Sequence, residues 1–149
     1  NRWLKRVEIS NDLRMGIEKI SEPLDWILIT EPWCGDAAHN CPFIYLASEL
    51  NEKITLKINL RDGEDSLIQN YLTNGTSMSI PILVVRDADG NDLFVWGPRP
   101  KAAQEIVNQQ KTDESKTFEE KKIELQEWYN KNKGEDVHSE LVELLKSIG

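Results

Sequence analysis

Short apolar runs alternate with amphipathic stretches along the first half of the chain, and this pattern predicts a mixed α/β fold. Residues 2–20 carry apolar side chains at mostly helical spacing, which indicates one or two helices. DWILIT (25–30) is apolar in the way that is typical of a strand buried on both faces of a sheet. A helix is predicted over 34–50, and the alternating ITLKINL (54–60) predicts the next strand.

The second half continues this alternation and then becomes helical. A short helix is predicted over 64–73, and 80–97 reads as two strands joined by a turn with the sequence DADGN. From Pro98 onward the spacing is helical, and Gly134 separates the last two helices. Parallel strands connected through helices and followed by a hairpin favour a three-layer α/β/α sandwich.

Length and composition fit one domain with its own core. The chain has 149 residues, of which 39% are hydrophobic, so we expect a single domain over 1–149. The core is expected over about 25–110. Helices over about 112–149 are expected to form a C-terminal extension that offers a partner surface, for instance for a homodimer.

The charge of the chain excludes some classes of partner. A formal net charge of −8, from 18 Lys and Arg against 26 Asp and Glu, repels phosphate backbones and anionic membranes. No apolar run approaches the ~20 residues that span a bilayer, and the start shows no signal-peptide pattern. We therefore expect a cytoplasmic protein with no nucleic-acid or membrane partner. The first residue is Asn1 rather than Met, which leaves a removed upstream segment and export open.

The stretch TEPWCGDAAHNCPF (30–43) holds both cysteines of the chain. Cys34 directly follows the predicted strand and begins the predicted helix, where unpaired N–H groups and the positive end of the helix dipole favour a thiolate. Gly35 lets another backbone approach the sulfur, and Trp33 can shield one side of it. Cys34 is therefore the candidate reactive residue.

Trp33, Cys34 and Gly35, with Pro42 eight residues after the cysteine, resemble the W-C-G-P-C helix of the thioredoxin superfamily and its helix-kinking proline. The downstream order also fits, since LKINL resembles the central strand of that family, Ile80-Pro81 its cis-proline and Gly97 the glycine that closes its hairpin. More closely, EPWCGD and WGPRP resemble a little-characterised bacterial branch of thioredoxin-like proteins. The resemblance implies a thioredoxin-like fold with an N-terminal helix, and a cis peptide bond before Pro81.

Three positions depart from the family pattern. The second cysteine of that pattern is replaced by Ala37, the usual proline by Asp36, and a buried aspartate used in proton transfer by Leu28. The negative charge of Asp36 should oppose formation of a thiolate at Cys34. The two-cysteine mechanism of the family is therefore incomplete in this chain.

Cys41 is the candidate resolving cysteine only if the helix unwinds. Seven helical residues rise ~10.5 Å, whereas a disulfide accepts a Cα separation of about 4.4–6.8 Å. We expect Cys41 to be a small buried residue on the inner face of the helix. Helical geometry also places His39 ~140° around from Cys34, so these side chains cannot converge on a metal ion. We expect His39 to lie on the exposed helix face, and His138 is isolated in an acidic helix.

Two functions remain open from the sequence. The first is a monothiol thiol-disulfide oxidoreductase, in which Cys34 attacks a protein or small-molecule disulfide and an external thiol resolves the intermediate. Ile80 and Pro81 would contact the substrate, and Trp33 and Asp36 would shape access. No cofactor is required beyond a thiol co-substrate such as glutathione or bacillithiol. The alternative is a non-catalytic module whose groove binds a peptide or small ligand.

Overall fold

The computed structural model describes residues 8–31 and 35–148. Its helices and strands follow one another in the order α1 (Asn11–Glu18), β1 (Leu24–Thr30), α2 (Gly35–Ser48), β2 (Ile54–Leu60), the 3-10 turn η2 (Ile68–Asn70), β3 (Ile82–Arg86), β4 (Asp92–Trp96), α3 (Lys101–Gln110), α4 (Phe118–Asn132) and α5 (Glu135–Ile148). The mixed sheet with helices packed on it is a thioredoxin-like α/β fold, as expected from the sequence.

The four strands form one sheet in the order β2-β1-β3-β4, with β1 and β3 at its centre. β1 runs parallel to β2 and antiparallel to β3, and β3 and β4 form the predicted hairpin. The carboxyl end of β1 leads directly into the TEPWCGD stretch. The sheet therefore brings the carboxyl end of β1 beside the start of β3.

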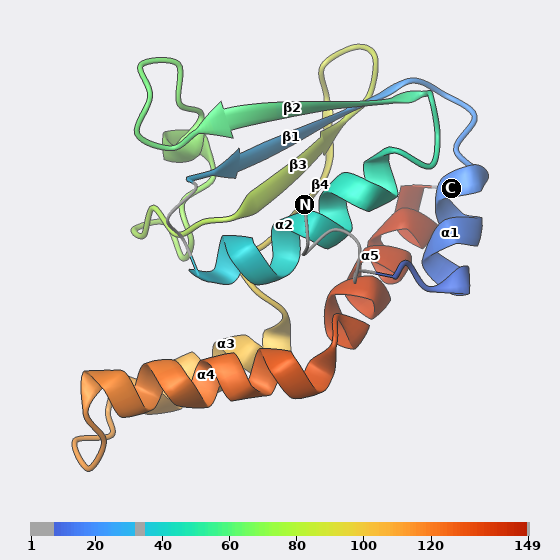
Figure 1. The fold of residues 1–149 in the computed structure, drawn as a ribbon. Helices are drawn as coiled ribbons and strands as arrows, with labels where there is room; N and C mark the ends of the chain where they lie inside the picture. The colour runs from blue at the N-terminus through green and yellow to red at the C-terminus, as the bar shows by residue number, and fades with distance from the viewer. Residues whose placement is uncertain (1–7, 32–34, 149) are drawn as a thin grey trace.

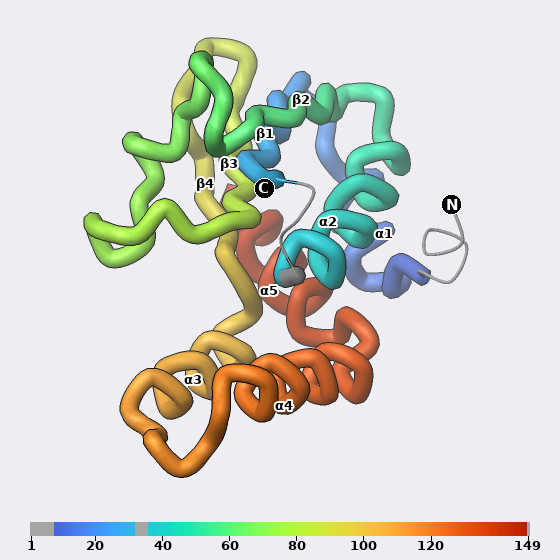
Figure 2. Tube along the Cα trace, turned by 60° about the vertical axis from the view of Figure 1, so that its left-hand side comes forward, coloured from blue at the N-terminus to red at the C-terminus, as the bar shows by residue number. Residues whose placement is uncertain are grey.

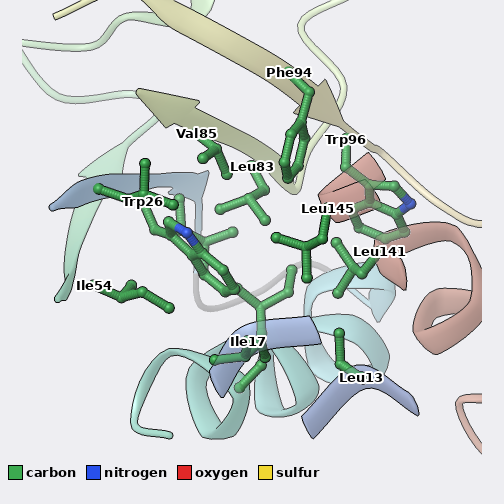
Figure 3. Close-up of a cluster of buried hydrophobic side chains, with 14 of the residues drawn as sticks. Leu13, Ile17, Trp26, Ile54, Leu83, Val85, Phe94, Trp96, Leu141 and Leu145 are labelled. Carbon is green, nitrogen blue, oxygen red and sulfur yellow. The ribbon is translucent and has the colours of Figure 1, made fainter. Parts of the chain in front are cut away.

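One face of the sheet packs against α1, α2 and α5 (Figures 1 and 3). Trp26 of β1 is fully buried at the centre of this cluster, and Leu83 of β3 lies beside it. The helices add Ile17, Ile44 and Leu141, each of them fully buried. Because α5 supplies part of this core, the sheet is packed by both ends of the chain as well as by its middle.

The opposite face is covered by the connection between β2 and β3, and the helix expected over 64–73 is wrong. A single 3-10 turn, η2, replaces it and buries Ile68 against the sheet. The side chain of Asn59 explains the difference, since it donates to the carbonyl of Asp65 (3.0 Å) and accepts from the N–H of Leu67 (2.9 Å). The backbone groups that a helix would pair are held by this side chain instead.

Only one helix precedes β1 in the described part of the chain. The side chain of Ser10 accepts from the N–H of Leu13 (3.2 Å) and so caps α1. Residues 1–7 lie outside the described residues. Later in the chain α2 is continuous through Pro42, the residue that resembles the helix-kinking proline of the family.

The C-terminal helices occupy two places. α3 and α4 lie side by side away from the sheet, and α5 turns back to pack on it (Figures 1 and 2). A capping box between Thr117 and Glu120 starts α4, and Lys133 and Gly134, both with positive φ, end it. Among the described helices, none is long and apolar enough to cross a membrane.

Candidate functional site

The candidate site lies where β1 ends and α2 begins. β1 ends at Thr30 and α2 starts at Gly35, the residue that directly follows Cys34 in the sequence. Trp33 and Cys34 lie outside the described residues, so their roles stay predictions. The described residues around this connection show what charges and polar groups the site contains.

The predicted cis peptide bond between Ile80 and Pro81 is confirmed. Both residues are buried, and Ile80 packs in the cluster on the second face of the sheet. A second cis peptide bond, Gly97–Pro98, was not predicted from the sequence. Gly97 has φ +129°, and a Cβ placed on it would lie 2.2 Å from the carbonyl oxygen of Pro81, so the two loops touch through a glycine that has no room for a side chain.

Asp36, two residues after Cys34, forms an ion pair with Arg99. Nη2 of Arg99 lies 2.9 Å from Oδ2 of Asp36, and its Nε donates to Oδ1 at 3.3 Å. The two side chains are only 12% and 15% exposed, for Asp36 and Arg99 respectively. The pair joins the EPWCGD stretch to the WGPRP stretch, and its two residues are 63 positions apart in the sequence. The bidentate geometry fixes the carboxylate in place, and the guanidinium opposes its charge.

Tyr129 of α4 completes this group. Its hydroxyl donates to Oδ1 of Asp36 and accepts from Nδ2 of Asn40 (3.1 Å). Burial, followed by the negative charge of Asp36, raises the pKa of Tyr129 far above its ordinary value. Tyr129 is therefore protonated and acts as a donor to the carboxylate at any physiological pH.

His39 is not the exposed residue that the sequence suggested. It is half-buried, and its ring stacks on that of Tyr129 with centroids 4.4 Å apart and an interplanar angle of 3°. Burial lowers the pKa of His39, and the nearby Asp36 opposes this shift only in part. His138 is also buried, with Nδ1 against the carbonyl oxygen of Gly134 and its ring edge-on to Phe43.

The residue that stands where the family has its second cysteine is buried. Ala37 is 7% exposed, so the first turn of α2 is packed there. Cys41, expected to be buried, is half-buried, and its Sγ lies 3.9 Å from Oγ1 of Thr30 while it packs against the core. Whether Cys41 can act as a resolving cysteine stays a prediction.

Glu31 is a titratable residue at the site that the sequence analysis did not single out. Its Oε2 is buried and has no hydrogen-bond partner among the described residues. Its position in EPWCGD, three residues before Cys34, was the available signal. Within the same described ranges, no three His, Cys, Asp or Glu side chains lie close enough together to hold a metal ion. Since Cys34 lies outside them, the expected absence of a metal stays a prediction.

Comparison with known proteins identifies the family of the chain. A family model described as "Thioredoxin" matches residues 1–122, and the chain belongs to this thioredoxin family. No curated protein matches it.

Two solved structures have a similar fold. A protein of unknown function, PA1234 from Pseudomonas aeruginosa, superposes with a TM-score of 0.72 at 19% identity, covering 99% of this chain and 82% of that one. An HIV epitope-scaffold protein superposes with a TM-score of 0.67 at 19% identity, covering 97% of this chain and 81% of that one. At this level of identity both similarities concern the fold alone.

Proposed function

We propose that the protein is a monothiol thiol-disulfide oxidoreductase of the thioredoxin family and that Cys34 is its nucleophile. Its substrates are mixed disulfides between a protein or small molecule and a low-molecular-weight thiol such as glutathione or bacillithiol. This chemistry needs a reduced thiol pool, which places the reaction in the cytoplasm.

The observation that carries the monothiol assignment is the environment of positions 37 and 41. Ala37 fills the position of the second cysteine and is packed into the protein. Cys41 is the only other cysteine in the chain, and its sulfur lies against Thr30 in the second turn of α2. We therefore expect an external thiol to resolve a mixed disulfide on Cys34.

The reaction consists of two thiol-disulfide exchanges. The Cys34 thiolate attacks the sulfur of the small thiol in the substrate disulfide, a Cys34 mixed disulfide forms, and the rest of the substrate leaves as a thiolate. A second small thiolate then attacks the small-thiol sulfur of that mixed disulfide. This step returns the Cys34 thiolate and releases the symmetric disulfide of the small thiol. Over the two exchanges the remaining substrate sulfur is reduced to a thiolate, one external small thiol is oxidised, and the number of disulfide bonds stays the same.

The surroundings of Cys34 support this role. The residue immediately precedes a helix of 14 residues, whose first N–H groups stabilise negative charge. The cis peptide bond before Pro81 stands at the start of β3, the neighbour of β1 in the sheet. The carboxylate of Asp36, which the sequence suggested would oppose a thiolate, is paired with Arg99.

The test is turnover of a glutathionylated peptide with glutathione as co-substrate, measured for the wild type and for Cys34→Ser and Cys41→Ser. We expect Cys34→Ser to abolish turnover and Cys41→Ser to retain it. We also expect mass spectrometry to find the small thiol bound to Cys34. Loss of turnover in Cys41→Ser, with a mixed disulfide trapped on Cys34, would show that Cys41 resolves the intermediate. A wild-type protein without turnover or adduct would favour the binding-module alternative.

A further inference from the structure

The triad of Asp36, Arg99 and Tyr129 gives the C-terminal half of the chain a part in the chemistry of Cys34. We propose that Arg99 and Tyr129 are positioning residues that hold and neutralise the Asp36 carboxylate, and thereby allow Cys34 to ionise near neutral pH. This inference rests on the function proposed above, because it concerns the nucleophile of that reaction.

Asp36 follows Cys34 by two residues in the sequence. Two residues of chain span at most about 7 Å, so the Cα atoms of the two residues cannot be further apart. A carboxylate near a thiol raises the pKa of that thiol on the order of one unit if nothing opposes its charge, and the Asp36 side chain is only 12% exposed. An unpaired Asp36 would therefore cancel much of what the start of α2 contributes.

The structure removes this obstacle through Arg99. Both nitrogens that face the carboxylate are within hydrogen-bond distance, at 2.9 and 3.3 Å, and both side chains are mostly buried. Solvent and salt therefore screen the pair weakly. Arg99 is itself oriented by Nη1, which donates to Oε1 of Gln104 in α3 at 2.7 Å. A guanidinium stays protonated at every pH of interest, so Arg99 keeps its positive charge.

Tyr129 holds the same carboxylate from α4. Its hydroxyl is fixed between Asn40 and Asp36, so its proton points at the carboxylate oxygen. Since Tyr129 remains uncharged, it adds a hydrogen bond without adding a charge. Its contribution to the pKa of Cys34 should thus be smaller than that of Arg99.

Two more titratable residues lie close to Asp36 in the sequence. His39 stacks on Tyr129 from α2, and burial lowers its pKa, so it adds little positive charge at pH 7. Glu31 lies at the end of β1 with one carboxylate oxygen buried. Neither group contacts Asp36 through a hydrogen bond in the described residues, so Arg99 is the group that opposes the Asp36 charge directly.

The chain offers a matched control on the far hairpin. Arg86, Asp92 and Tyr71 form a triad of the same residue types. Nε of Arg86 lies 2.8 Å from Asp92, and the Tyr71 hydroxyl lies 2.7 Å from both partners. This triad joins β3, β4 and the η2 segment and does not involve the TEPWCGD stretch. Arg86→Gln therefore removes a more exposed ion pair of the same residue types without touching Asp36.

The experiment measures the pKa of Cys34 from the pH dependence of its alkylation by iodoacetamide, in a Cys41→Ser background with folding checked by circular dichroism. We expect Arg99→Gln to raise this pKa by on the order of one unit, and Asp36→Asn, which leaves Arg99 unopposed, to lower it. In the double variant Asp36→Asn/Arg99→Gln the pKa of Cys34 should be close to that of the starting protein. Tyr129→Phe should raise this pKa less than Arg99→Gln does. Arg99→Lys should restore part of the effect, and Arg86→Gln should change nothing.

Two results would overturn the inference. One is an unchanged pKa in Arg99→Gln. The other is a combination of two observations: the pKa of Cys34 is unchanged in Asp36→Asn, and it is raised as much in the Asp36→Asn/Arg99→Gln double variant as in Arg99→Gln. Arg99 would then act on Cys34 without Asp36. Alkylation needs no disulfide substrate. The inference can therefore fail while the wild type turns over mixed disulfides, and it can hold where turnover is absent.

Discussion

The imidazole of His39 lies flat against the ring of Tyr129, with centroids 4.4 Å apart, although the two residues are on α2 and α4. This stack, together with the hydrogen bond from Asn40 to the Tyr129 hydroxyl, attaches the C-terminal helical pair to the first turns of α2. The helix that follows Cys34 is therefore supported by a residue far along the chain.

Truncation of Tyr129 should separate two of its contributions. Tyr129→Phe keeps the stack but removes the partner of Asp36 and Asn40, which should lower the free energy of unfolding by about 1–3 kcal/mol. Tyr129→Ala also removes the ring and should cost about 3–5 kcal/mol. Urea unfolding followed by Trp fluorescence measures both. Equal losses in the two variants would mean that the stack contributes nothing.

The burial of His39 predicts a dependence of stability on pH. Its pKa in the folded state lies below the ordinary 6.5, so the unfolded chain takes up a proton first as the pH falls. The free energy of unfolding should thus be unaffected by His39 above pH 6.5 and should decline as the pH falls from there toward the lowered pKa. Urea unfolding of the wild type and of His39→Gln over this window provides the measurement. Parallel curves for the two proteins would contradict the prediction.

The strands were predictable because each is a local apolar pattern. ITLKINL agrees with β2 residue for residue, and DWILIT with β1 to within one residue. The helix expected over 64–73 failed because Asn59, outside that segment, holds its backbone groups. Helical spacing also does not show which face of a helix is covered by the rest of the protein. In α4 the apolar side chains of Phe118 and Ile123 are 79% and 54% exposed.

The candidate site was predictable in its sequence-local parts only. The cis peptide bond before Pro81 could be inferred from the family resemblance, because it belongs to a single dipeptide. The pairing of Asp36 with Arg99 joins residues 63 positions apart, and no local pattern indicates it. No local pattern indicates the contact of Tyr129 with Asp36 either, because Tyr129 lies in a charged stretch that is typical of a solvent-exposed helix. Interactions of this kind depend on how α3 and α4 pack, which periodicity does not determine.

α5 should be required for the stability of the whole fold. Leu141 is fully buried in the cluster that contains Trp26 and Leu83. Leu141→Ala should therefore lower the free energy of unfolding by about 2–5 kcal/mol. Ile123→Ala on α4 removes an exposed side chain of similar size and should change it by less than about 0.5 kcal/mol. Chemical unfolding of the two variants gives the comparison. A small loss for Leu141→Ala would show that α5 is dispensable for the core.

Alanine substitutions at Gly97 and Gly90 can separate the effect of the contact between the two cis-proline loops from the effect of backbone strain. Both glycines have positive φ, +129° and +85°, so an alanine is strained at either position. A Cβ on Gly90 meets nothing within 4 Å, whereas on Gly97 it would lie 2.2 Å from the carbonyl oxygen of Pro81. Gly90→Ala should cost roughly 1–2 kcal/mol of unfolding free energy from strain alone.

Gly97→Ala should cost about 1–3 kcal/mol more than Gly90→Ala, because the added methyl group must also displace backbone at the start of β3. That backbone cannot yield as a flexible side chain would, since β3 is paired on both sides, with β1 and with β4. Urea unfolding of both variants measures the difference. Equal losses would mean that the Pro81 loop moves freely away from Gly97, and the close packing of the two loops would then not constrain the position of the Ile80–Pro81 peptide beside the end of β1.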